Sequence, residues 1–159
     1  MAVWQFNTTL VPKRWFDTGG SIASLISGDG WETASAWKGV DGVGLKERIE
    51  GILPRGKSWH SELTLWGSEQ KSDIQMFRNL GFVESLRVRF DLRKPDMQLF
   101  RAVSDMAQEH NLVILDMARK RALPHLNDLV RAAAESDAAH FVLDPASFLE
   151  QVGVSARAT

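Results

Sequence analysis

The chain is predicted to fold as one α+β domain, an antiparallel sheet of about four to six strands with three or four helices packed mainly on one face. Of its 159 residues, 44% are hydrophobic and 25% are charged, the ordinary balance of a compact protein. Apolar and polar residues alternate in several segments before residue 94, and apolar residues recur at helical spacing in most segments after it. The domain is expected to span residues 1–153, followed by a frayed tail at 154–159.

The first third of the chain predicts a strand, an irregular stretch and a helix. Residues 3–11 alternate apolar and polar side chains, which favours a strand that Pro12 ends. The glycine-rich stretch 13–44 predicts turns with a short helical segment. From Leu45 the apolar residues fall on one helical stripe, and Pro54 is expected to stop this helix.

Three strands in an antiparallel meander are expected next, at 61–66, 72–77 and 83–93. In the third strand, four apolar residues alternate with four charged ones: Leu86, Val88, Phe90 and Leu92 against Arg87, Arg89, Asp91 and Arg93. One face of this strand is therefore expected to be buried and the other solvated.

The last third of the chain predicts a helix, a strand, a helix, a strand and a helix, in that order. Their positions are, in turn, Pro95 to Ala107, 112–115, Pro124 to Ala134, 140–143, and Pro145 to Gly153. Asp144 before a proline is typical of a helix start, and a glycine is typical of a helix end.

Composition excludes several classes of function. The chain has no cysteine, which rules out disulfides, thiolate zinc sites and a cysteine nucleophile. A net charge of -1 gives no electrostatic attraction to nucleic acid or to an anionic membrane. No secretion signal or membrane-spanning run is visible. We therefore expect a cytoplasmic protein without a cofactor, whose partner is another protein, with a homodimer left open.

One segment matches a nucleotide-binding motif. Residues 51–58 read GILPRGKS, which fits the P-loop pattern through Gly51, Gly56, Lys57 and Ser58. Asp116, at the end of a short apolar strand, has the position of the aspartate linked to magnesium in such proteins. The alternative function is therefore an enzyme that binds nucleotides or phosphates. The context argues against it, because a helix precedes the motif and a strand follows it, the reverse of a P-loop.

A metal site is a third hypothesis. His60 and Glu62 lie two residues apart on a predicted strand, so their side chains would point the same way. With Asp73 on the next strand they would supply two or three ligands or an acid–base pair. The competing interpretation is a solvated strand face, and no metal is expected.

A protein-binding surface is the favoured hypothesis. All six tryptophans precede residue 67, and two of them, Trp31 and Trp37, lie among small and polar residues typical of loops. The stripe Arg87, Arg89 and Arg93 would recognise an acidic partner. The competing interpretations are tryptophans in the core and arginines paired across strands with neighbouring carboxylates, namely Glu62, Asp73 and Asp91.

The chain also resembles a group of small uncharacterised proteobacterial proteins. The segments that carry the resemblance are AVWQFNTTLVP, DGWETASAWKG, ILPRGKSWHSELTLWGSEQKSDI, ESLRVRFDLR and AAHFVLDPASFLE. In size, charge balance and architecture it is similar to the immunity proteins that protect bacteria from polymorphic toxins. The resemblance implies a non-enzymatic module that covers the active site of a partner.

Overall fold

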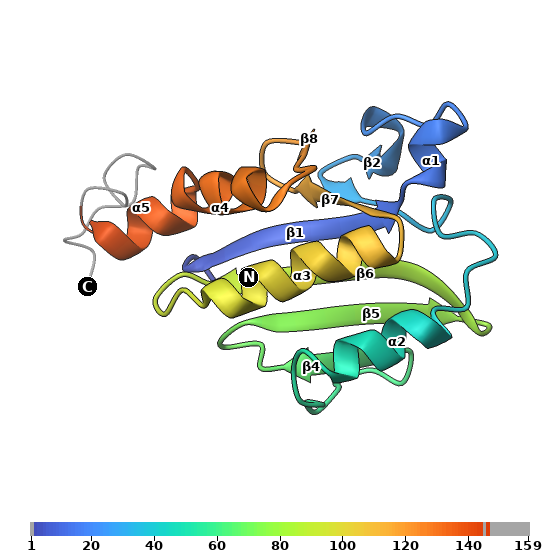
Figure 1. Cartoon of the computed structure of the whole chain (residues 1–159), viewed down its shortest axis with the longest axis horizontal. Coiled ribbons are helices and arrows are strands. Elements are labelled where there is room, and N and C mark those ends of the chain that lie inside the picture. The colour runs from blue at the N-terminus through green and yellow to red at the C-terminus, as the bar shows by residue number, and fades with distance from the viewer. Residues whose placement is uncertain (1, 145, 147–159) are drawn as a thin grey trace.

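The computed structural model describes residues 2–144 and 146. Within these residues, six strands form one antiparallel sheet in the order β4-β5-β6-β1-β7-β8 (Figure 1). The strands are β1 Gln5–Pro12, β4 Leu63–Gly67, β5 Asp73–Asn79, β6 Phe82–Asp91, β7 Leu112–Asp116 and β8 Arg121–Ala122. A separate short hairpin pairs β2 (Ile26–Ser27) with β3 (Gly30–Trp31). The predicted α+β class with an antiparallel sheet is confirmed.

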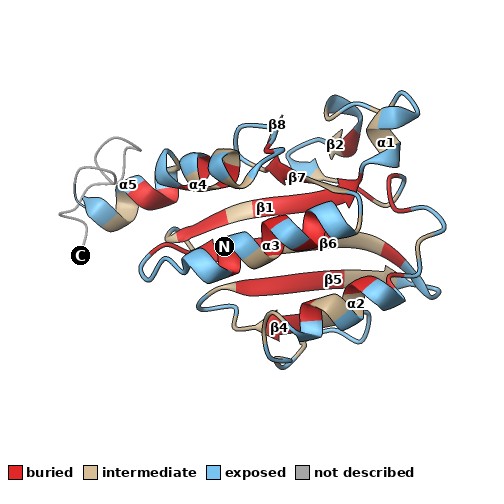
Figure 2. Cartoon of the chain, in the orientation of Figure 1, coloured by how far each residue is buried: buried red, intermediate tan, exposed pale blue. Residues whose placement is uncertain are grey.

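The longer helices cover one face of this sheet, as predicted. The helices are α1 Arg14–Asp17, α2 Val43–Glu50, α3 Met97–Glu109, α4 Leu126–Ala134 and α5 Asp137–Leu143. Apolar residues of α2, α3, α4 and α5 form one core with those of the sheet, and Figure 2 shows the central strands buried along most of their length. Among the described helices, none combines the length and the apolar character needed to cross a bilayer.

Strand β1 is the centre of the sheet, because it pairs with β6 on one side and with β7 on the other. Its Phe6 ring lies 6.3 Å from that of Phe90, which in turn stacks on Phe100 of α3 at 4.2 Å. These contacts tie the strand, its neighbour and the longest helix into one unit. Aromatic pairs of this kind add about 0.5–1.5 kcal/mol beyond the area they bury.

The opposite face of the sheet has apolar cover over β1 and β7. There Val11 and Leu115 form a second core with Leu25 and Ala36, which come from the segment between β1 and α2. The half-buried residues that pack against this core are Trp15, Phe16, Ile22, Trp31 and Val113. The same face of β5 and β6 presents polar side chains instead.

Several predictions about local structure need correction. Residues 140–143 belong to helix α5 and form no strand, because Ser136 caps the helix by accepting a hydrogen bond from the amide of Ala139 at 3.2 Å. Strand β1 does end at Pro12, as predicted, and Pro12 pairs with Leu112; the short strand β8 was not predicted. The expected helix at 145–153 and tail at 154–159 lie outside the described residues, apart from residue 146.

Candidate functional site

Buried and half-buried polar side chains lie on the face of β1, β5 and β6 that turns away from the helices, which we call the polar face. Directly opposed residues of an antiparallel pair lie on the same face. Asp73 is opposite Arg89, and Arg87 lies between Gln75 and Thr9. The residues that make up the polar face are Gln5, Asn7, Thr9, Asp73, Gln75, Arg87, Arg89 and Asp91.

Asp73 and Arg89 form a buried ion pair on this face. Arg89 donates from Nε to Oδ1 of Asp73 at 2.8 Å, and its Nη2 also donates to Oδ2. Gln75 donates a third hydrogen bond, to Oδ2 at 3.0 Å. The hydrogen bonds to Asp73 raise the pKa of Arg89. The Asp73 carboxylate therefore accepts three hydrogen bonds from within the sheet, and its role is to stabilise the fold.

Arg87 differs from its neighbour in having no partner. Its guanidinium is half-buried, yet it forms no ion pair and donates no hydrogen bond to any residue that the structure describes. Burial lowers the pKa of Arg87, the charge of Arg89 lowers it further, and Asp73 raises it. Removing a charge from water without a partner is unfavourable. The central strand of the polar face thus carries a half-buried positive charge that forms no ion pair or hydrogen bond with the described residues, although Asp73 lies close enough to act on it.

Aromatic and apolar side chains border the polar face. Phe77 of β5 follows Gln75 on the same face and is half-buried. The indole of Trp59 packs edge-on against the Phe77 ring at 6.0 Å, although 62% of Trp59 is exposed. On the other side, Leu115 lies opposite Thr9 and belongs to the second core. An exposed tryptophan packed on a half-buried phenylalanine, near a guanidinium without an ion pair, is an arrangement typical of protein-binding surfaces.

The three predicted arginines have different roles, and the expectation that the whole stripe is solvated is wrong. Arg89 is buried, as described above. Arg93 is exposed and bonded through Nη2 to Asp91 at 2.9 Å, with its guanidinium 4.2 Å from the Trp4 ring. The hydrogen bonds from Arg93 lower the pKa of Asp91. Arg89 is therefore paired with Asp73 across the strands, and Arg93 is paired with Asp91 on its own segment. Of the three arginines, only Arg87 has no ion pair with a described residue.

The two predicted tryptophans are also placed differently. Trp37 is 1% exposed and its indole donates a hydrogen bond to the Leu10 carbonyl at 3.1 Å, so the idea of an exposed Trp37 is wrong. Trp31 is half-buried in β3 against the second core. Trp59, whose position we did not predict as a binding residue, is the exposed one. The sequence feature that could have identified Trp59 is its position between a turn containing proline and glycine and the next strand, where a large aromatic residue has little to pack against.

The residues of the P-loop match do not form a phosphate site. The segment follows helix α2 and leads into β4 without opening a helix. The amide of Gly56 is bonded to the Leu65 carbonyl at 2.8 Å, and the Ser58 hydroxyl to the His60 carbonyl at 2.6 Å. Lys57 is exposed beside them, and Gly51 is the C-cap of α2.

Asp116 is also far from that segment. Three strands separate β4 from β7, which places the two strands about 19 Å apart at the usual strand spacing. The Asp116 carboxylate is buried and accepts hydrogen bonds from the amides of Ala118 and Arg119 at 3.1 and 3.2 Å. It stabilises the turn that follows β7.

The predicted metal ligands also form hydrogen bonds within the protein and do not converge on one point. His60 and Glu62 precede β4 in a turn, where Nδ1 of His60 accepts a hydrogen bond from the Glu62 amide at 3.0 Å. Asp73 is held by Arg89. Among the residues described, no group of three or more His, Asp or Glu side chains is arranged to hold a metal ion.

The half-buried charge of Arg87, for which desolvation is the largest influence on the pKa, predicts an effect on stability. The variant Arg87→Met keeps an unbranched stem and removes the charge, so its free energy of unfolding is expected to rise by about 0.5–2 kcal/mol. Urea denaturation at pH 7 measures this. Arg101→Met, on the exposed side of α3, is the matched control and should change stability by no more than about 0.5 kcal/mol. A less stable Arg87→Met would show that the fold already uses this charge.

Comparison of the chain with protein-family models, with curated proteins and with solved structures gives no match.

Proposed function

We propose that the chain is a cytoplasmic, non-enzymatic module that binds another protein and covers its functional surface, as toxin-immunity proteins do. The observation that carries the proposal is the half-buried, unpaired Arg87 on the polar face. A carboxylate of the partner would accept two parallel hydrogen bonds from this guanidinium. Arginine and aromatic residues of this kind supply a large share of the binding energy in protein interfaces.

The strands that carry the polar face end in an exposed apolar hairpin, which supports the same proposal. Leu80, at the turn between β5 and β6, has a left-handed backbone (φ 51°) and is 89% exposed. A left-handed conformation costs a leucine about 1–2 kcal/mol, and with so much of its surface in solvent little packing within the chain offsets this cost. Phe82, two residues later, is 49% exposed. A partner that covers this tip would bury both side chains.

The proposed interface therefore comprises Arg87, the aromatic pair of Trp59 and Phe77, and the tip of the hairpin. Stable interfaces of standard size bury about 800 Å² on each partner, which requires all three parts to take part together. Trp31 lies at the opposite border, over the second core. Trp37 has no place in the interface, because it belongs to the first core.

The experiment is a comparison of partner capture by two matched variants. The tagged full chain is used to isolate proteins from cells that contain it naturally, and the partner identified by mass spectrometry is purified and titrated calorimetrically. We expect Arg87→Met to weaken the complex by about 100-fold, since truncating one side of a buried charge pair costs about 2–5 kcal/mol. Arg101→Met should leave the affinity within about threefold.

A partner that binds Arg87→Met as tightly as the natural chain contradicts the proposal. The stability measurement described above excludes unfolding as the reason for a loss, because Arg87→Met is expected to be the more stable protein.

A further inference from the structure

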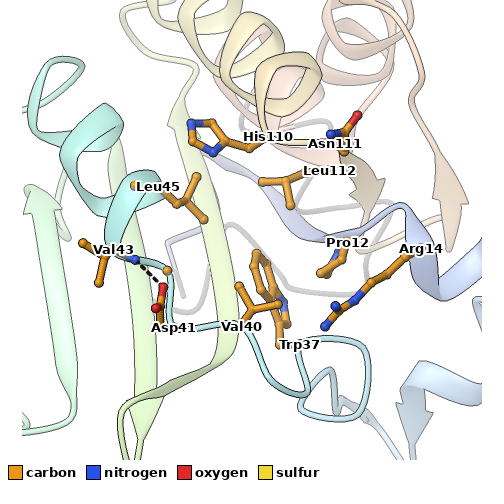
Figure 3. Close-up of a pocket in the computed structure, with 12 residues that line it drawn as sticks. Pro12, Arg14, Trp37, Val40, Asp41, Val43, Leu45, His110, Asn111 and Leu112 are labelled. Carbon is orange, nitrogen blue, oxygen red and sulfur yellow. Dashed lines mark hydrogen bonds between the residues drawn. The ribbon is translucent and has the colours of Figure 1, made fainter.

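A cavity lies between the end of β1, the start of α2 and the turn from α3 to β7 (Figure 3). Its volume is about 460 Å³, within the 300–1,000 Å³ typical of small-molecule sites. Its apolar wall is formed by Pro12, Trp37, Val40, Leu45 and Leu112. The side chains with polar groups around it are those of Arg14, Asp41, His110 and Asn111.

The walls of this cavity are fixed by hydrogen bonds from separate parts of the chain. The Trp37 indole is bonded to Leu10, as described above, and the amide of Val83 donates to the Val40 carbonyl at 2.8 Å. On the other side, the amide of Lys13 donates to the Asn111 carbonyl at 2.8 Å. A cavity whose walls are held in this way exists before a ligand arrives, which lowers the entropic cost of binding.

Gly42 is a further requirement for the shape of the cavity. Its backbone is left-handed (φ 73°), and a Cβ atom at this position would lie 2.5 Å from Cγ2 of Val83. Only glycine therefore allows the segment before α2 to pack so closely on β6. This packing sets Val40 and Asp41 at the edge of the cavity.

Arg14 is the cationic group of the cavity. Figure 3 shows its guanidinium directed towards Trp37 and Val40, with Asp41 on their other side. One Arg14 nitrogen donates to the Lys38 carbonyl, which leaves most of its five N–H donors for other acceptors. Arg14 forms no ion pair within the described part of the chain.

The other polar groups narrow the choice of ligand. Asp41 accepts a hydrogen bond from the Val43 amide at 3.1 Å, and its carboxylate lies at the edge of the cavity. Arg14 would pair with one negative charge on the ligand, whereas a second negative charge would have no such partner and would be repelled by the Asp41 carboxylate. The imidazole of His110, half-buried, makes no hydrogen bond to a residue that the structure describes, and its ring N–H is a further donor beside the cavity.

We infer that this cavity binds a small monocarboxylic acid with an apolar body. The carboxylate would be held by Arg14, and the aromatic or branched aliphatic body would lie on the half-buried Val40 and Leu112, next to the buried Trp37 and Leu45. The site is separate from the polar face, and the inference does not depend on the proposed function.

The test is a titration of the ¹⁵N-labelled full chain with phenylacetate and with isovalerate, followed by two-dimensional NMR. The indole N–H of Trp37 reports on the apolar wall. We expect saturable shifts of this signal and of the Leu45 and Leu112 amides, with a Kd on the order of 0.1–1 mM for a ligand of this size.

The uncharged phenylacetamide and the doubly charged phenylsuccinate are the ligand controls, and both should bind at least about 10-fold more weakly than phenylacetate. Arg14→Gln should weaken phenylacetate by a similar factor, whereas Arg101→Gln should not change its binding. Three results would overturn the inference: no saturable shift with either acid, equal binding of the amide, or unchanged binding to a folded Arg14→Gln.

Discussion

Replacing Trp37 with alanine is expected to lower the free energy of unfolding by about 3–5 kcal/mol, a large part of the stability of a domain of this size. The indole is 1% exposed and packs in the core between the sheet and the helices. Its removal leaves a cavity, and it also leaves the Leu10 carbonyl without the hydrogen bond from Nε1. Urea denaturation followed by circular dichroism measures the loss.

Trp59→Ala is the matched control for this experiment, because it deletes the same side chain at a position that is 62% exposed. Its free energy of unfolding should change by less than about 1 kcal/mol. Equal losses at the two positions would contradict the placement of Trp37 in the core. The result also bears on any test of partner binding that would change Trp31 and Trp37 together, since both were expected in the binding surface. This double variant would measure folding instead.

The second large effect is expected at the ion pair of the polar face. Asp73→Ala should destabilise the protein by about 3–5 kcal/mol, because it leaves the buried Arg89 without its counter-charge. Arg87 would then lie on the same strand as a second arginine that has no ion-pair partner. Chemical denaturation at pH 7 provides the measurement.

Two comparisons separate the charge from the packing. Glu109→Ala breaks the exposed pair of Glu109 with Arg48, which spans 2.8 Å, and should cost no more than about 1 kcal/mol. The double variant Asp73→Leu with Arg89→Met replaces both charges with apolar groups and should recover most of the lost stability. If the double variant is as unstable as Asp73→Ala, burial of an unpaired charge is not the cause.

The elements with a clear hydrophobic period were predictable from the sequence. The alternation in β6 and the helical stripe of α3 each have a single apolar face, and this face is the one that lies in the core. Residues 140–143 show the limit of this reasoning. A short apolar run fits a strand or a helix equally well, and the Ser136 cap with the alanines after it decides for the helix.

The candidate site was predictable only in part, since pairing across strands is a property of the folded sheet. The sequence presents Arg87 and Arg89 as equivalent members of one stripe. They differ because Asp73 lies opposite Arg89, whereas Gln75 and Thr9 lie opposite Arg87. The burial of Trp37 has a similar origin, because the small residues around it are typical of a loop and the strand that it covers is 27 positions away.

The central place of β1 has a consequence for how the protein forms during synthesis. Thr8 pairs with Val88 on one side and with Asp116 on the other, so both neighbours of this strand are translated long after it. At about 5–20 residues per second, the ribosome needs roughly 5–20 s to reach the second neighbour. The partner for one edge of β1, strand β6, is synthesised first, and the partner for the other edge, β7, follows about 20 residues later. Residues 5–12 therefore cannot take their final place between two neighbouring strands until β7 has been synthesised.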